Sequence, residues 1–234
     1  MSAKKHQSDR KRSRPPEPKK NNLLKNNKLV LGVLISIILV FIAAAYVLMA
    51  NNAGDAQDDN QDTDMSEGNP IALIETSMGS IRVELYEDLV PNTVTNFINL
   101  ANDDFYENLV FHRVANLMPS EPNTHVIQGG GFNTGGNQKT SPFGTVDLEI
   151  HPDVRHVDGA IAMARTSDPN SATSQFYICD GIHSFLDDNY AAFGVVIEGM
   201  DVVRDIASVE TTTKNGMQDW PVEDVIINSI TIDN

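Results

Sequence analysis

The chain has 234 residues, of which 41% are hydrophobic and 21% charged, and these proportions fit a globular protein with a core and exclude a wholly disordered chain. Its formal net charge of −15 is unevenly divided, because residues 1–50 carry ten basic and two acidic side chains whereas residues 51–234 carry seven basic and thirty acidic ones. Such an acidic body repels the phosphates of nucleic acids, so we expect no nucleic-acid partner.

An apolar stretch at residues 29–50 follows a basic tail at residues 1–28. From Leu29 to Ala50 no side chain is charged, and a helix of this length spans about 33 Å, enough to cross a hydrocarbon core of about 30 Å. A buried helix of a soluble protein is one alternative, but such helices rarely lack a polar face. A cleavable signal peptide is another, but its apolar region is normally about 7–15 residues long and is followed by a small-residue cleavage site. We therefore favour an uncleaved transmembrane anchor that embeds residues 29–50 in a lipid bilayer.

The charges that flank this stretch predict its orientation. Ten basic side chains precede it, and six acidic ones lie between residues 55 and 67. Because positive flanks stay on the cytoplasmic side, we expect a single-pass protein of the cell membrane with a cytoplasmic N-terminus and an extracytoplasmic C-terminal domain. Residues 51–69 are polar and acidic, which is typical of a flexible, self-repelling linker. Residues 70–234 are enough for one domain with a single core.

This domain begins and ends with patterns typical of β-strands. Residues 71–76 and 81–86 flank a turn at Met78 and Gly79, and residues 225–232 are again strand-like. Short β-type runs lie between these ends, at 126–128, 160–164, 174–178 and 191–196. Two helices are predicted, one beginning near Pro91 and the other after Gly199. Many short strands with two helices indicate a mainly β fold, a closed antiparallel β-barrel whose open ends are covered by the helices.

Standard catalytic motifs are missing from the sequence, which has no nucleophile elbow, phosphate-binding loop or dinucleotide fingerprint. The single cysteine, Cys179, excludes an intramolecular disulfide, and its apolar neighbours favour a buried inert thiol over a nucleophile. His151 and His156, which have acidic neighbours, are an alternative metal pair, but their segment is typical of an irregular surface loop. We therefore expect neither a metal nor a cofactor.

Several short blocks, in one order, are more specific than any single motif. They are FY at 105–106, FHRV at 111–114, QGGGF at 128–132, AMAR at 162–165, SQFYI at 174–178, FLD at 185–187, and FG at 193–194 with EGM at 198–200. Over nearly all of residues 70–234 they resemble the cyclophilin family of peptidyl-prolyl cis–trans isomerases, here in a prokaryotic membrane-anchored form. The resemblance implies an eight-stranded antiparallel barrel capped by two α-helices. It also implies an enzyme without metal or cofactor, because prolyl isomerisation breaks no covalent bond.

The resemblance assigns roles to particular residues. Arg113 matches the catalytic guanidinium; the alternative is an exposed arginine in a salt bridge. Gln128 and Gln175 match the residues that hold the substrate backbone and orient that arginine. Further positions match segments that bind the peptide backbone or surround the proline ring, and these are Ala164, Arg165, Thr166, Tyr177, Phe185, Leu186 and Tyr190.

The segment between Arg113 and Gln128 is longer than in the family pattern. Counting back from Gln128 puts His125 and Val126 where the family usually has Phe and Met, and we prefer this count because residues 126–128 are typical of a continuous strand. If the extra residues fall later in the segment, Leu117 and Met118 line the proline pocket instead.

The rim of the groove departs from the family pattern as well. Phe185 stands where cyclophilins that bind cyclosporin tightly usually have a tryptophan, and Tyr190 stands where many members have a histidine. The resemblance therefore implies weakened cyclosporin binding. The only tryptophan of the chain, Trp220, is expected in a loop before the last strand.

The leading hypothesis is a monomeric peptidyl-prolyl isomerase whose substrates are proline-containing segments of exported or membrane proteins. A catalytically weak module that binds proline-containing peptides is one alternative, favoured by the altered pocket residues. A membrane-tethered scaffold is the other.

Overall fold

The structure is a computed structural model that describes residues 68–121 and 123–233. The chain divides into two units, residues 1–63 and 64–234, and every described residue belongs to the second. The predicted basic tail and membrane anchor, and nearly all of the predicted linker, therefore lie outside the described residues. Within residues 68–121 and 123–233, no helix has the length and apolar character needed to cross a membrane.

Strands are the predominant regular structure of the described domain. They are Ile71–Thr76 (β1), Gly79–Leu85 (β2), Leu109–Phe111 (β3), Arg113–Asn116 (β4), His125–Gly129 (β5), Phe132–Asn133 (β6), Ala160–Met163 (β7), Phe176–Asp180 (β8), Ala192–Glu198 (β9), Thr211–Lys214 (β10), Met217–Pro221 (β11) and Val225–Asp233 (β12). The helices are Pro91–Asn102 (α2) and Met200–Ala207 (α3), with a single 3₁₀ turn at Ser184–Leu186 (η1). The predicted mainly β fold with two α-helices is confirmed.

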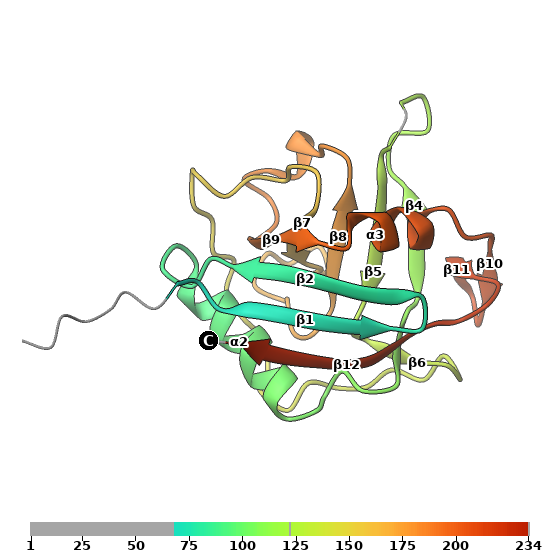
Figure 1. Ribbon diagram of the computed structural model, residues 1–234, viewed down its shortest axis with the longest axis horizontal. Helices are drawn as coiled ribbons and strands as arrows, with labels where there is room; N and C mark the ends of the chain where they lie inside the picture. Colours follow the sequence, from blue (N-terminus) through green and yellow to red (C-terminus); the bar gives the residue numbers. More distant parts are fainter. Residues whose placement is uncertain (1–67, 122, 234) are drawn as a thin grey trace, which may run out of the picture. The chain divides into compact units, whose positions relative to one another are not determined.

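The sheet differs from the predicted closed ring of eight strands. Ten strands pair in the order β4-β5-β8-β7-β9-β2-β1-β12-β3-β6, while β10 and β11 form a separate hairpin. The large sheet curls into a half-barrel. In Figure 1 strands β1, β2 and β12 run across the view, and β4, β5 and β8 run upright, at a steep angle to the first three. Among the described residues its outer strands, β4 and β6, do not pair with each other. The two sides of the sheet meet through the chain instead, because only His112 separates β3, which pairs with β12, from β4, which pairs with β5.

The two faces of the central strands carry different clusters of side chains. Their inner face joins the main core, to which α2 contributes Phe97, packed edge-on against Phe176 with ring centroids 5.5 Å apart. Their outer face carries a smaller cluster that includes Val126, Ala162 and Tyr177. Because neighbouring residues of a strand point to opposite faces, β5, β7 and β8 serve both clusters at once.

The hairpin of β10 and β11 corrects the expected position of Trp220. This residue lies in β11 rather than in a loop, is fully buried, and donates its indole N–H to Asp224 at 2.7 Å. The turn of the hairpin is Asn215–Gly216, where both residues have positive φ angles of 54° and 83°. This dipeptide is a strong hairpin signal in the sequence. The hairpin was missed because its strands lack the apolar alternation of a half-buried strand.

Candidate active site

Three polar side chains on neighbouring strands form a relay on the outer face of the sheet. Arg113, the first residue of β4, pairs with Gln128 of β5 across the ladder. The Arg113 guanidinium donates from Nη1 to Gln128 Oε1 at 3.4 Å, and Gln128 Nε2 donates to Oε1 of Gln175 at 3.0 Å. Since Gln175 immediately precedes β8, adjacent strands fix all three side chains, and the two amides hold the guanidinium from one side.

A carboxylate approaches the guanidinium as well. Asp219 of β11 lies 3.6 Å from Arg113 Nε, and both side chains are about two-fifths exposed, at 42% and 40%. The separate hairpin is therefore what brings Asp219 to the site. The prediction from sequence missed this residue because the site blocks contain no signal for it.

A cavity of about 350 Å³ lies beside Arg113. It collects residues from β4, β5, β8 and η1, and from the segments that follow β4, β7 and η1. Its lining residues are Arg113, Leu117, Val126, Gln128, Ala164, Arg165, Tyr177, Phe185, Leu186 and Tyr190. Most of the predicted site residues thus surround one pocket, with apolar walls and a polar edge at Arg113 and Gln128.

The extended segment after Arg113 contributes one residue from each of the two alternatives. Val126 and Leu117 line the cavity, whereas His125 and Met118 do not. His125 precedes Val126 in β5 and so points to the other face, where its Nδ1 lies 3.9 Å from Asp180. The assignment of His125 to the pocket is therefore corrected.

Two other predicted residues lie in an adjoining cavity of about 280 Å³. Thr166 and Gln175 line it, and it shares Gln128, Ala164 and Arg165 with the first cavity. The backbone N–H of Ala164 donates to the Gln175 carbonyl at 2.8 Å, and that of Thr166 donates to Ser171 Oγ at 3.0 Å. These bonds fix the segment after β7 along the groove.

Arg165 and Tyr190 line the same cavity as Arg113 and form part of its rim. The Arg165 guanidinium lies 4.5 Å from the centroid of the Tyr190 ring and donates from Nε and Nη2 to the Asn189 carbonyl at 2.9 and 2.7 Å. Tyr190 in turn meets Tyr177 edge to face, with centroids 6.1 Å apart. Phe185 stands at the same rim and is 50% exposed.

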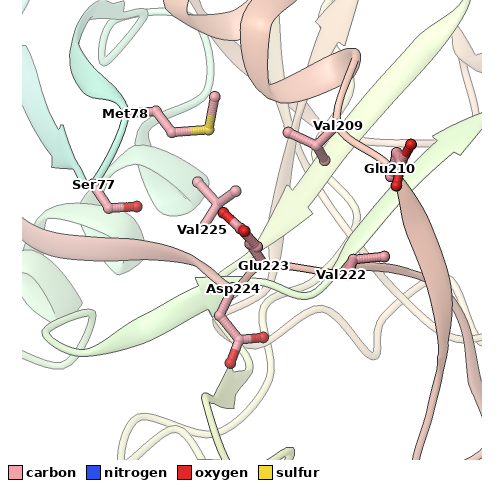
Figure 2. Close-up of a pocket in the computed structure, with 8 residues that line it drawn as sticks. All are labelled: Ser77, Met78, Val209, Glu210, Val222, Glu223, Asp224 and Val225. Atoms are coloured by element: carbon pink, nitrogen blue, oxygen red, sulfur yellow. The ribbon is translucent and has the colours of Figure 1, made fainter.

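A larger cavity, of about 590 Å³, lies elsewhere in the domain, and Figure 2 shows its lining. Valines and Met78 supply its apolar part. The charged residues among those that line it are Glu210, Glu223 and Asp224, all of them acidic. It contains none of the predicted site residues and no cationic donor, so the smaller cavity beside Arg113 is the candidate site.

Comparisons with known proteins identify the family of the chain. The family model described as cyclophilin type peptidyl-prolyl cis-trans isomerase/CLD matches residues 71–232. The chain belongs to this family.

Individual cyclophilins and related isomerases are similar to most of the chain. The peptidyl-prolyl cis-trans isomerase of Acinetobacter baylyi is 40% identical over 169 residues, which are 70% of this chain and 86% of that protein. Isomerase B of Escherichia coli is 38% identical over 165 residues, 67% of this chain and 96% of that protein. A cyclophilin-type isomerase of Cryptosporidium parvum, crystallised in the presence of the dipeptide Ala-Pro, is similar in structure with a TM-score of 0.60 and 27% identity, over 70% of this chain and 99% of that one. The predicted family and its enzyme class, peptidyl-prolyl cis–trans isomerase, are confirmed.

Two histidines of this cyclophilin are buried near the site. Burial, with a contribution from the positive charge of Arg113, lowers the pKa of His112 to about 4, so that His112 is neutral near pH 7. His156, which we expected in a surface loop, is only 1% exposed and bonds to Tyr177 and Asp187. Its partners are distant in sequence, which is why sequence patterns could not reveal it.

The sequence raised two other kinds of site, a metal pair and a reactive cysteine, and neither is found among residues 68–121 and 123–233. In that part of the chain no group of three or more His, Cys, Asp or Glu side chains could hold a metal ion. Cys179 is buried in β8, and burial raises the pKa of its thiol, so the thiol is not a reactive nucleophile at neutral pH.

Proposed function

We propose that this cyclophilin, anchored in the membrane by residues 29–50, accelerates the isomerisation of X-Pro bonds in exported or membrane proteins. The observation that carries the catalytic part is the relay of Gln175, Gln128 and Arg113 at the edge of an apolar cavity of about 350 Å³. The location rests on the basic tail, the uncharged stretch and the acidic residues that follow it.

The proposed mechanism lowers a barrier that comes from amide resonance and amounts to about 18–20 kcal/mol. In the twisted transition state the prolyl nitrogen regains its lone pair and becomes a hydrogen-bond acceptor. The Arg113 guanidinium donates to that nitrogen while the side chains of Val126, Tyr177 and Leu186 hold the proline ring. Because the hydrogen bond from Arg113 to the prolyl nitrogen forms only when the peptide bond is twisted, it stabilises the transition state more than the planar substrate.

A site of this kind can supply the reduction in activation free energy that catalysis requires. An acceleration of about 10⁵ needs about 7 kcal/mol. A hydrogen bond from a charged donor contributes about 1.5–3 kcal/mol. The remainder has to come from holding the ring in the pocket and from the partly desolvated groove, in which the charge-separated planar amide is less stable than in water.

The test of the catalytic part measures prolyl exchange in a peptide with the full-length chain and its Arg113→Ala variant. We expect the unmodified chain to accelerate exchange and the variant to lose at least about tenfold in kcat/KM, which is about 1.4 kcal/mol. Arg82→Ala is the matched control, because Arg82 of β2 also faces a carboxylate, with its Nε 3.6 Å from Glu198, but lies outside the groove.

Each outcome of this test decides between the hypotheses. Equal rates for the unmodified chain and Arg113→Ala remove Arg113 from its proposed role. If neither protein accelerates exchange although both bind a proline peptide, the alternative of a weakly catalytic binding module replaces the proposal.

The location is tested by adding protease to intact cells or spheroplasts. We expect the domain from residue 70 onward to be removed while the N-terminal tail stays protected. Full protection of that domain, with digestion after lysis as the control, contradicts the proposed orientation.

A further inference from the structure

A chain of three hydrogen-bonding side chains lies behind the wall of the cavity beside Arg113. Tyr177 lines that cavity, and its hydroxyl oxygen is 2.9 Å from Nε2 of His156. Nδ1 of His156 is 2.9 Å from Oδ1 of Asp187. The His156 ring is 1% exposed and does not line the cavity, so it can influence a bound proline only through its neighbours.

The chemistry of the three groups fixes the direction of both hydrogen bonds. The Asp187 carboxylate only accepts, so His156 Nδ1 carries the hydrogen and donates it. Burial lowers the pKa of His156 and raises that of Tyr177, so at neutral pH the imidazole is uncharged and the phenol keeps its proton. Nε2 is then an acceptor, and the Tyr177 hydroxyl donates to it. With these two donors, Tyr177 to His156 and His156 to Asp187, both ring nitrogens of His156 and the Tyr177 hydroxyl have hydrogen-bond partners. The hydrogen bond to His156 holds the Tyr177 ring in one orientation.

Asp187 connects the same histidine to a second wall of the cavity. It directly follows η1, whose Phe185 and Leu186 line the cavity. Besides the ring nitrogen, Asp187 Oδ1 accepts the backbone N–H of His156 at 2.9 Å, and Oδ2 lies 3.8 Å from Arg155 Nη1. These contacts hold His156 itself in place, so the imidazole is a fixed acceptor for the tyrosine.

We propose that His156 is a positioning residue for the proline pocket, which it keeps in shape by holding the Tyr177 hydroxyl. This inference rests on the proposed function of the cavity as the site of the proline ring. Without His156 the hydroxyl is buried with no acceptor, and the ring has to turn toward solvent or toward the cavity to find one. A pocket that is no longer preorganised binds the proline ring more weakly.

The experiment is a double-mutant cycle on prolyl exchange by the full-length chain. In the unmodified background we expect His156→Leu to raise KM about tenfold, with kcat changed less than about twofold. In a Tyr177→Phe background, where no hydroxyl needs an acceptor, the same substitution should raise KM less than about threefold. The same increase in both backgrounds would overturn the inference, because it would mean that His156 acts independently of Tyr177.

Three single variants keep the test decisive if His156→Leu does not fold. His156→Gln keeps one donor and one acceptor and should bring KM within about twofold of the unmodified chain. Tyr177→Phe alone should raise KM about threefold, whereas Tyr106→Phe should leave it unchanged. Tyr106 is the matched control, because its buried hydroxyl donates to the Ser174 carbonyl at 3.2 Å and lies outside the cavity. Equal KM values for the two Tyr→Phe variants contradict the inference even if His156→Leu does not fold.

A failure of the proposed function is recognised separately. If the unmodified chain does not accelerate exchange, the same variants are compared by their Kd for a proline-containing peptide. The inference then stands if His156→Leu weakens binding only where the Tyr177 hydroxyl is present, and fails if it weakens binding equally in both backgrounds.

Discussion

The two faces of β5, β7 and β8 have different roles: one packs in the main core and the other borders the candidate site. On the inner face large apolar side chains are fully buried and join one core, among them Ile127, Ile161, Phe176 and Ile178. On the outer face small residues are buried, namely Ala160 and Ala162 of β7 and, on the neighbouring β9, Ala192. Small side chains on that face leave room, and Arg113, Gln128 and Tyr177 border the cavity beside them.

Because the faces differ in this way, the inner face contributes mainly to the stability of the fold and the outer face mainly to the candidate site. Burying a large apolar side chain contributes about 1.5–3 kcal/mol, so the inner face accounts for most of what these strands give to folding. The outer face holds polar groups that satisfy one another in pairs and remain open to a substrate. Substitutions on the two faces should therefore have separable effects.

The largest expected effect is that of Phe176→Ala on the inner face. The Phe176 ring lies against three other aromatic rings, those of Phe97, Tyr106 and Phe111, at centroid distances of 5.5, 5.5 and 6.0 Å. Its removal leaves a cavity, so the free energy of unfolding should fall by about 3–5 kcal/mol in denaturant titrations. Val126→Ala on the outer face is the comparison and should cost about 1–2 kcal/mol. Equal losses would mean that the two faces do not differ in this way.

The inner face is also the part of the fold that sequence patterns could predict. Alternation of apolar residues places β1, β2 and β12, and the 3.6-residue period places α2 and α3, close to their observed bounds. The number and order of the strands were not predictable, because the interruption at His112 depends on the pairing of β3 with β12 and of β4 with β5, which the sequence pattern does not reveal. The exposed threonines of β10 carry no periodic signal at all.

The outer face could not be predicted from periodicity, because single polar residues have no period. Arg113, Gln128 and Gln175 were found only through the resemblance of their blocks to cyclophilins. Asp219 and His156 were missed, since their contacts with Arg113 and Tyr177 join segments far apart in the sequence.

The second prediction probes the rim of the outer face with cyclosporin. Phe185 keeps apolar area at this position, but it lacks the indole N–H of the tryptophan usual in tightly binding relatives. An acceptor left without a donor at a dry interface costs about 1–3 kcal/mol, or about five- to over a hundredfold in affinity. We expect weak inhibition of the full-length chain and tighter inhibition of Phe185→Trp. Tight inhibition of the unmodified chain would show that this donor is dispensable.

The third prediction concerns the pH dependence of stability and the buried His112, which lies between β3 and β4. Its pKa is about 4 in the folded protein because of burial, below the usual 6.5 of the unfolded chain. The unfolded chain therefore binds more protons between these values, and stability falls as the pH is lowered through them. Between pH 8 and pH 5 the loss from His112 should be about 2 kcal/mol. Denaturant titrations at both pH values should show this loss, and His112→Gln should reduce it. An unchanged pH dependence in the variant would contradict the assignment.

The smallest expected effect is that of Asp219→Asn on catalysis. Because the Asp219 and Arg113 side chains are about two-fifths exposed and their closest charged atoms are 3.6 Å apart, water and salt screen the pair. Exposed pairs of this kind are worth about 0–1 kcal/mol, so kcat/KM at low ionic strength should change by less than about fivefold. At 0.5 M salt, where the Debye length is about 4 Å and so comparable to the separation of the pair, the difference between variant and unmodified chain should become smaller. A loss as large as that of Arg113→Ala, and unaffected by salt, would instead make Asp219 essential for holding the guanidinium, and the hairpin of β10 and β11 would then be part of the catalytic face.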